Sequence, residues 1–158
     1  MAPGRSILAA MVTDTQRDLY KVLRDSQDKY TYFLLTGAGA GIAFAVNQTQ
    51  GAKLGWSLAP LGVAVLCWGL SFFFGCRQIA YVNSTLYANS ELLRVEAGEH
   101  PRAGSHPEVI AAASAGIRDA MEHNSKTANA LGHLQFRALV AGGVLYVCWH
   151  VVTLYLRS

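Results

Sequence analysis

The chemistry of His150 stands out, because it is an ionisable side chain inside a stretch that carries no other charge-bearing group except cysteine. Imidazole exchanges a proton near neutral pH, and an ionisable group within a membrane helix indicates a functional site. In an oligomer, copies of His150 would form a ring able to gate or select ions. The alternative is a neutral His150 that hydrogen-bonds a neighbouring helix. Further polar residues could line such an ion path: Thr36, Asn47, Ser57, Ser71 and Thr153.

A second group of chemistry-bearing residues lies outside the apolar stretches. Arg118 and His123 form an Arg-x4-His pattern, which is similar to the RNA-cleaving motif of HEPN domains. Both residues also fit the solvated face of a helix, and we favour that interpretation. His100 and His106 lack a Cys or carboxylate at the spacing of a zinc site. Since no phosphate loop, nucleophile elbow or carboxylate pair is present either, we expect no enzyme activity, cofactor or metal centre.

Three stretches without Asp, Glu, Lys or Arg must position these side chains: Tyr30–Ala52, Leu54–Cys76 and Ala138–Leu156. At about 1.5 Å of rise per residue, each suits a helix that crosses about 30 Å of hydrocarbon. A charge at the bilayer centre costs about 2.5 to 3.5 kcal/mol on insertion scales, which explains why the charged residues occupy the remaining segments. The sequence therefore predicts an integral membrane protein with three spans.

Helical patterns continue from the predicted spans into the charged segments. Apolar residues at helical intervals from Asp14 onward predict an amphipathic helix that runs into the first span. A similar stripe leads from the second span to about Val95, while Ser105 and Glu108 have capping-box spacing at the start of a third helix. Pro60 predicts a kink in the second span, because it removes a backbone donor.

We therefore predict an all-α membrane protein in which three transmembrane helices with cytosolic helical extensions form a helical bundle. The expected segments are, in order, an N-terminal cytosolic amphipathic helix (1–29), a transmembrane hairpin (30–76, with spans at about 30–49 and 54–76), a cytosolic helical hairpin (77–136) and a third transmembrane helix (137–158).

Basic residues predict the orientation of the spans. Of the 13 Lys and Arg residues, all but Lys53 and Arg157 fall on one side of the predicted spans. Lys29, Arg77 and Arg137 lie directly against the spans on that side. Because cytoplasmic segments carry the excess of Lys and Arg, we predict a cytoplasmic N-terminus and an external C-terminus. The expected location is a bacterial inner membrane.

Small residues recur at helical spacing in every predicted span. Such faces allow another helix to approach closely. The candidates are Gly37, Gly41 and Ala45 in the first span, Gly55, Ala59, Gly62 and Gly69 in the second, and Gly142 in the third. Packing within one chain can use part of this surface. Together these faces offer more close-packing surface than one three-helix bundle can use, so we predict a homo-oligomer.

In layout the chain resembles small bacterial membrane effectors of anti-phage systems, including the SLATT type, which join a pair of spans to a cytosolic helical part. The third predicted span is a departure from that layout. The chain also resembles the accessory membrane pores of some RNA-targeting CRISPR systems, since it combines a membrane helix with an Arg-x4-His pattern. Either resemblance implies depolarisation or leakage of the host membrane on infection.

Two functions remain open. The first is an oligomeric pore or ion channel, whose cytosolic helices serve assembly and sensing. The second is a membrane scaffold or adaptor that anchors and regulates a partner protein through Asp14–Lys29 and Arg77–Gln135, because an apolar helix stripe also binds the helices of a partner. Membrane lipid is an expected contact in both. The net charge of +3 is small, with acidic and basic residues interleaved, so nucleic-acid binding is not expected.

Overall fold

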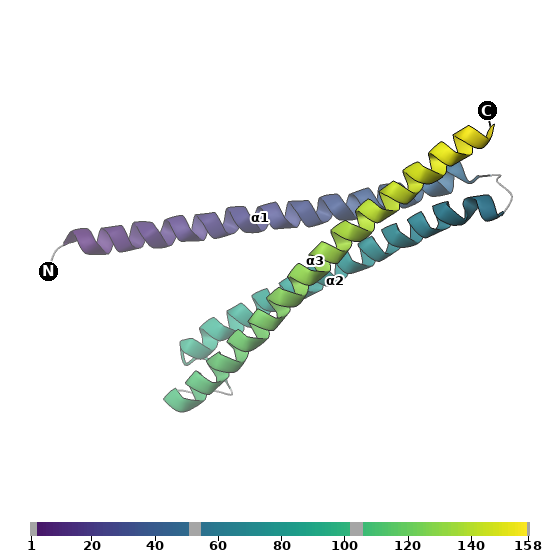
Figure 1. The fold of residues 1–158 in the computed structure, drawn as a ribbon. Coiled ribbons are helices and arrows are strands. Elements are labelled where there is room, and N and C mark those ends of the chain that lie inside the picture. The colour runs from purple at the N-terminus through teal and green to yellow at the C-terminus, as the bar shows by residue number, and fades with distance from the viewer. Residues whose placement is uncertain (1–2, 51–54, 102–105, 158) are drawn as a thin grey trace.

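The computed structural model describes residues 3–50, 55–101 and 106–157, and within these ranges the chain is helical and forms no strand (Figure 1). The elements are α1 (Pro3–Gln48), a 3-10 turn η1 (Trp56–Leu58), α2 (Ala59–Glu96) and α3 (Pro107–Arg157). The predicted all-α helical bundle is therefore confirmed.

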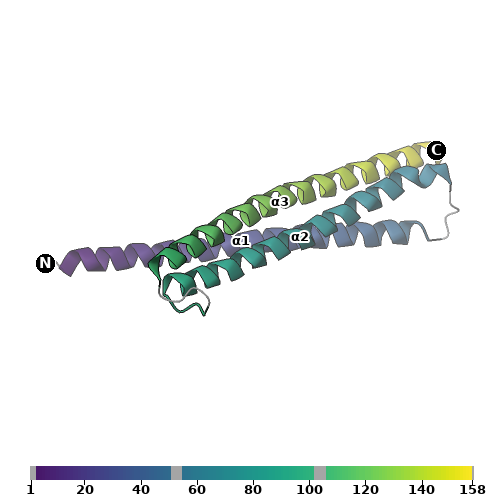
Figure 2. The same cartoon turned by 90° about the horizontal axis from the view of Figure 1, so that it is seen from below.

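α2 and α3 form an antiparallel hairpin, and α1 packs on this pair over only part of its length. In Figure 1 the N-terminal half of α1 diverges from the hairpin, and Figure 2 shows α1 extending beyond the end at which α2 and α3 are connected. The C-terminus lies at the opposite end of the bundle, beside the connection between α1 and α2. The three helices thus form a bundle at one end, and α1 separates from the α2–α3 hairpin at the other.

α1 and α2 continue through the boundaries between charged and uncharged sequence. α1 begins at Pro3, well before the expected start near Asp14, and runs unbroken into the first uncharged stretch. α2 continues to Glu96, where Gly98 ends the helix with a φ of 70°. The N–H groups of Gly98 and Glu99 donate to the carbonyls of Val95 and Arg94 at 3.0 Å, which is the Schellman pattern of helix termination.

The expected kink at Pro60 is wrong. α2 begins at Ala59, after η1, so Pro60 lies in the first turn of the helix. A proline there breaks no helical hydrogen bond, since the first N–H groups of a helix have no partner within it. The second uncharged stretch therefore contains a 3-10 turn and a tight helix start before the main body of α2.

Two helices in the described part of the chain are long and apolar enough to cross a membrane, rather than the predicted three. They correspond to Trp56–Glu96 and Pro107–Tyr155. α1 is not among them, because its uncharged stretch is diluted by glycines and by polar residues: Tyr30, Thr31, Tyr32, Thr36 and Asn47. The prediction of three transmembrane helices is therefore supported for two of the three stretches.

The hydrophobic core lies where the uncharged stretches meet. Its buried members are Ala38, Ala45, Leu61, Trp68 and Trp149. Trp68 Nε1 donates to the carbonyl of Leu139 at 3.3 Å, and Trp149 Nε1 donates to the carbonyl of Ser57 at 2.9 Å. A buried indole needs a partner for its N–H, and each tryptophan finds one on a neighbouring element. The two indoles therefore join α2, η1 and α3.

Candidate functional site

Three of the small residues proposed for helix packing lie in the tightest part of the bundle. Ala45 is buried in the core, while Gly41 and Gly142 face Trp68 from α1 and α3. A Cβ atom built on Gly41 would stand 2.8 Å from the Trp68 ring, and one on Gly142 would stand 2.6 Å from Trp68 Nε1. Both distances are too short for a real contact, so these positions require glycine.

The other small residues do not take part in this packing. A Cβ on Gly37 would reach Leu139 at an ordinary distance of 3.8 Å, and a Cβ on Gly62 or Gly69 would meet no described atom within 4 Å. Gly55 and Ala59 are exposed. The small-residue surface of α2 is therefore unused within a single chain.

The polar residues proposed to line an ion path do not converge in one chain. Ser71 is fully buried, and its hydroxyl donates to the carbonyl of Gln135 at 2.9 Å. The Thr153 hydroxyl donates to the carbonyl of Trp149 in its own helix. Ser57 is exposed on η1, whereas Thr36 and Asn47 are exposed on α1. The core around Trp68 and Trp149 is instead filled by apolar side chains of the described residues.

His150 is exposed and stacks on an aromatic neighbour. Its ring lies 6.1 Å from that of Tyr146, with an angle of 11° between the planes. Tyr146 in turn makes an edge contact with Phe44 of α1, at 5.7 Å between ring centroids. His150 thus belongs to an aromatic cluster at the C-terminal end of α3, at the margin of the core.

Arg118 and His123 have separate environments. Arg118 Nη2 lies 2.5 Å from Glu96 Oε1, which links the start of α3 to the end of α2. His123 is exposed, and its backbone carbonyl accepts a hydrogen bond from the Thr127 hydroxyl. Arg118 therefore has a structural role in closing the hairpin, and the pair does not form a shared site.

Gln135 is a buried polar residue that the sequence patterns did not identify. Its side chain is fully buried, and neither Nε2 nor Oε1 has a hydrogen-bond partner among the described residues. The amide packs against Gly75 of α2, where a Cβ atom would stand 2.5 Å from Nε2 and 2.8 Å from a methyl group of Leu35. The Gln135 amide, at this junction of three helices, can therefore still donate and accept hydrogen bonds.

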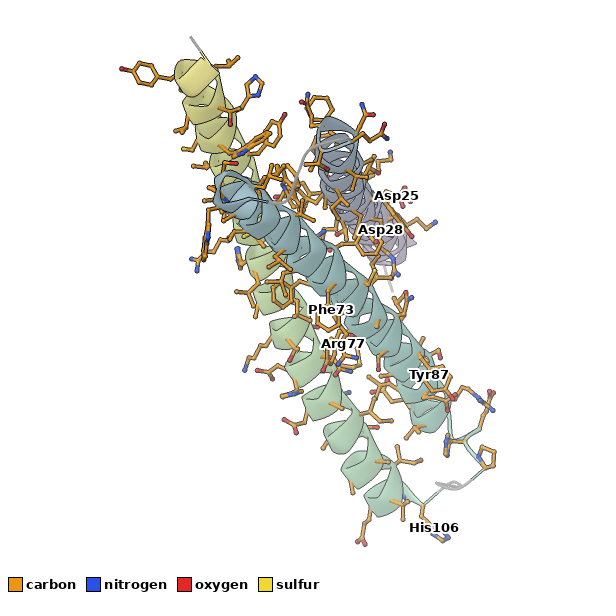
Figure 3. The ribbon with its side chains drawn as sticks, turned by 90° about the vertical axis from the view of Figure 1, so that its right-hand side faces the viewer. Asp25, Asp28, Phe73, Arg77, Tyr87 and His106 are labelled. Atoms are coloured by element: carbon orange, nitrogen blue, oxygen red, sulfur yellow. The ribbon has the colours of Figure 1, made fainter. Side chains whose placement is uncertain are left out.

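A cleft opens beside this junction, where α1 begins to diverge from the hairpin. It has a volume of about 410 Å³ and is lined by α1 between residues 24 and 32, α2 between 78 and 86, and α3 between 125 and 129. We call it the junction cleft. Its lining starts at the edge of the uncharged stretches and extends into the charged segments. Figure 3 shows Asp28 among the side chains of α1.

The junction cleft carries charged and amide side chains beside several hydroxyl groups. The charged and amide groups are the guanidinium of Arg24, the carboxylate of Asp28 and the amides of Gln27, Gln78, Asn83 and Asn129. Within the described part of the chain these side chains form no hydrogen bond or ion pair. The sequence contains each residue, but no local pattern indicates that three separate segments surround one cleft.

One ion pair on the hairpin lies within α3. Glu122 Oε1 and Lys126 Nζ lie 2.7 Å apart, one helical turn from each other. The hydrogen bond and the attraction to Lys126 lower the pKa of Glu122, and the same hydrogen bond raises the pKa of Lys126. Among the described residues, no group of three or more His, Cys, Asp or Glu side chains is arranged to hold a metal ion.

Comparison with known proteins gives no relative from which a function could be transferred: no protein-family model, curated protein or solved structure matches the chain significantly.

Proposed function

We propose that the chain is a subunit of an oligomeric membrane channel in which α1 faces the ion path and α2 and α3 face lipid. The observation that carries this proposal is a difference between the outer surfaces of the helices. Within the uncharged stretch, α1 exposes a stripe of small and polar residues bordered by Phe33 and Phe44, whereas α2 and α3 expose many bulky apolar side chains.

The apolar surfaces of α2 and α3 support insertion in a membrane. In the most apolar windows of these helices, only 28% and 6% of the residues are buried, which favours a lipid-facing position over the core of a water-soluble bundle. Their exposed side chains include Leu66, Leu70 and Phe73 on α2 and Val140, Val144, Val147 and Val151 on α3. A continuous exposed surface of this kind is stable in hydrocarbon and prone to aggregation in water.

The outer face of α1 supports contact with other copies and with an aqueous path. It carries a stripe of exposed residues at helical spacing, Thr36, Gly39, Ala40, Ala43 and Asn47, with the exposed Phe33 and Phe44 at its margin. They lie away from Leu34, Ala38 and Ala45, which are buried against the hairpin. Small residues let helices approach closely in membranes, while unpaired polar groups such as the Asn47 amide are costly in lipid. This face is therefore best placed toward further copies of α1.

A conducting path must then lie between subunits. Trp68 and Trp149 fill the centre of each bundle, and Gly41 and Gly142 close tightly on Trp68. A ring of α1 helices would leave this packing intact and place Thr36 and Asn47 along a shared axis. His150, which lies on α3, would flank this ring rather than form its constriction.

Orientation and location follow the same proposal. The end of the bundle bearing Lys29, Arg77 and Arg137 would face the cytoplasm, with the diverging half of α1 and the hairpin connection. The resemblance in layout to anti-phage membrane effectors implies that the channel depolarises a bacterial inner membrane.

The decisive experiment measures assembly and conductance of the purified protein. Mass determination in lipid nanodiscs should give a discrete oligomer, and planar bilayers should show unitary currents. Asn47→Leu and Thr36→Leu should reduce or block these currents, because they place an isobutyl group in the path. Val140→Leu is the matched control on the lipid-facing surface of α3, and it should leave the currents unchanged. His150→Ala should also leave them unchanged if His150 only flanks the ring.

A membrane scaffold is the second candidate, and the divergence of α1 favours it. The N-terminal half of α1 diverges from the hairpin (Figure 1). Such a charged helix could dock a partner protein. A purified protein that is monomeric and carries no current in bilayers would support the scaffold and contradict the channel.

A further inference from the structure

We propose that the junction cleft binds a small zwitterionic solute, of which a free α-amino acid is the simplest example. Arg24 would bind the anionic group of the solute, and Asp28 would bind its ammonium group. This inference goes beyond the channel proposal, because binding in the cleft requires no current.

The first argument is that two opposite charges share the cleft without pairing with each other. Arg24 and Asp28 are four residues apart on α1, yet their charged atoms are not within 4.0 Å of each other. An acidic residue that follows a basic one is the less favourable order for a pair within a helix. Since the two groups do not neutralise each other, each can form charge-assisted hydrogen bonds to a ligand.

The second argument concerns the rest of the lining. α2 contributes an apolar strip of Ile79, Val82 and Leu86, and amide groups from α2 and α3 border it. Most of the lining is polar, with this one apolar strip, and a volume of about 410 Å³ falls in the usual size range of small-molecule sites. The strip would hold the carbon side chain of the solute, while the amides would bind its remaining polar atoms.

The third argument is the balance of charge. One guanidinium and one carboxylate give the lining no net charge. A purely anionic ligand would be repelled by the carboxylate of Asp28, and a purely cationic ligand would be repelled by the guanidinium of Arg24. A zwitterion satisfies both groups at once, which is why we assign the cleft to this class.

The order of the two charges along α1 favours a soluble source over a lipid headgroup. Asp28 lies one turn, about 6 Å, nearer to the uncharged stretch than Arg24. Phosphatidylethanolamine with its acyl chains beside that stretch would place its phosphate on the near side and its ammonium on the far side. This order is the reverse of what Asp28 and Arg24 would bind, whereas a free amino acid can enter in either direction.

The test is calorimetric titration of the full-length protein in detergent with each of the twenty standard amino acids. At least one should bind saturably, and its analogues lacking the amine or the carboxylate should not. Arg24→Gln and Asp28→Asn should each weaken binding by about tenfold or more, since each removes charge-assisted hydrogen bonds. Lys21→Gln and Asp25→Asn remove the same charges from exposed positions of α1 outside the cleft, and they should leave the affinity unchanged.

Several results would overturn the proposal: no amino acid binding at millimolar concentration, equal binding of an analogue with one charge, or equal losses in the control variants. Binding of phosphatidylethanolamine in nanodiscs that depends on Arg24 and Asp28, seen by native mass spectrometry without amino-acid binding, would assign the cleft to a lipid headgroup instead. The channel proposal is judged separately, because a silent protein that binds an amino acid contradicts only the channel. A conducting protein that binds none contradicts only this inference.

Discussion

The indole of Trp68 on α2 lies directly against the backbone of Gly41 on α1, leaving no room for even a methyl group at position 41. Gly142 approaches the same indole from α3, where a Cβ would also stand 3.0 Å from the backbone carbonyl oxygen of Ala64. One aromatic side chain therefore occupies the meeting point of all three helices. Because a rigid ring and a backbone atom cannot move aside easily, this contact fixes how closely α1 and α3 approach α2.

We expect Gly41→Ala and Gly142→Ala to destabilise the bundle by about 1 to 3 kcal/mol each, because the added methyl group overpacks the core. Thermal unfolding in detergent, followed by circular dichroism, measures the effect. Gly62→Ala and Gly143→Ala are matched controls, since a Cβ at either position meets no described atom within 4 Å. Equal stability of all four variants would mean that Trp68 does not lie between these glycines.

Gln135→Met should stabilise the bundle. The substitution keeps the length of the side chain beside Gly75 and removes a buried amide that has no hydrogen-bond partner among the described residues. Leaving such a group unpaired costs about 1 to 3 kcal/mol, so a gain of similar size is expected in thermal unfolding. The Ser71 hydrogen bond should persist, because it uses the backbone carbonyl of residue 135. A loss of stability would instead show that the Gln135 amide binds a partner in the native protein.

The contribution of the Glu122–Lys126 pair to folding stability should fall at both low and high pH. Because the folded pKa of Glu122 is lowered, its contribution to stability is present above the unfolded pKa and is lost as pH falls through the folded value. The pKa of Lys126 is raised, so its contribution is present below the unfolded pKa and is lost as pH rises through the folded value. In Lys126→Met, the pKa of Glu122 measured by NMR should return toward its ordinary value of 4.5. An unchanged pKa would contradict the pairing.

Cysteine labelling should locate the two ends of the bundle if the proposed orientation holds. In a variant with Cys67, Cys76 and Cys148 replaced by Ala, an impermeant thiol reagent should label Gln50→Cys in intact cells and leave His106→Cys unlabelled. Positions 50 and 106 lie at opposite ends of the bundle and are both exposed. Permeabilised cells are the control, in which both should react. Labelling of position 106 alone in intact cells would reverse the orientation.

Much of the fold was predictable because it depends on residues close together in the chain. Helical periodicity and the absence of charge placed long helices across the uncharged stretches, and the hairpin connection lies in the segment rich in Gly and Pro. The kink at Pro60 was not a safe prediction, because the effect of proline depends on whether it lies in the first turn or the interior of a helix. A 3-10 turn before Ala59 settles that question in the structure.

The sequence by itself determined that the chain is helical, where its charge-free stretches lie and which glycines could permit close packing. Only the tertiary structure decided that Gly41 and Gly142 use this capacity, that Gln135 is buried, and that Arg24 and Asp28 share a cleft with amides of α2 and α3. The physical reason is that periodicity defines the faces of each helix, whereas the rotation of a helix about its axis is set by long-range packing. In this protein that packing is centred on the indole of Trp68.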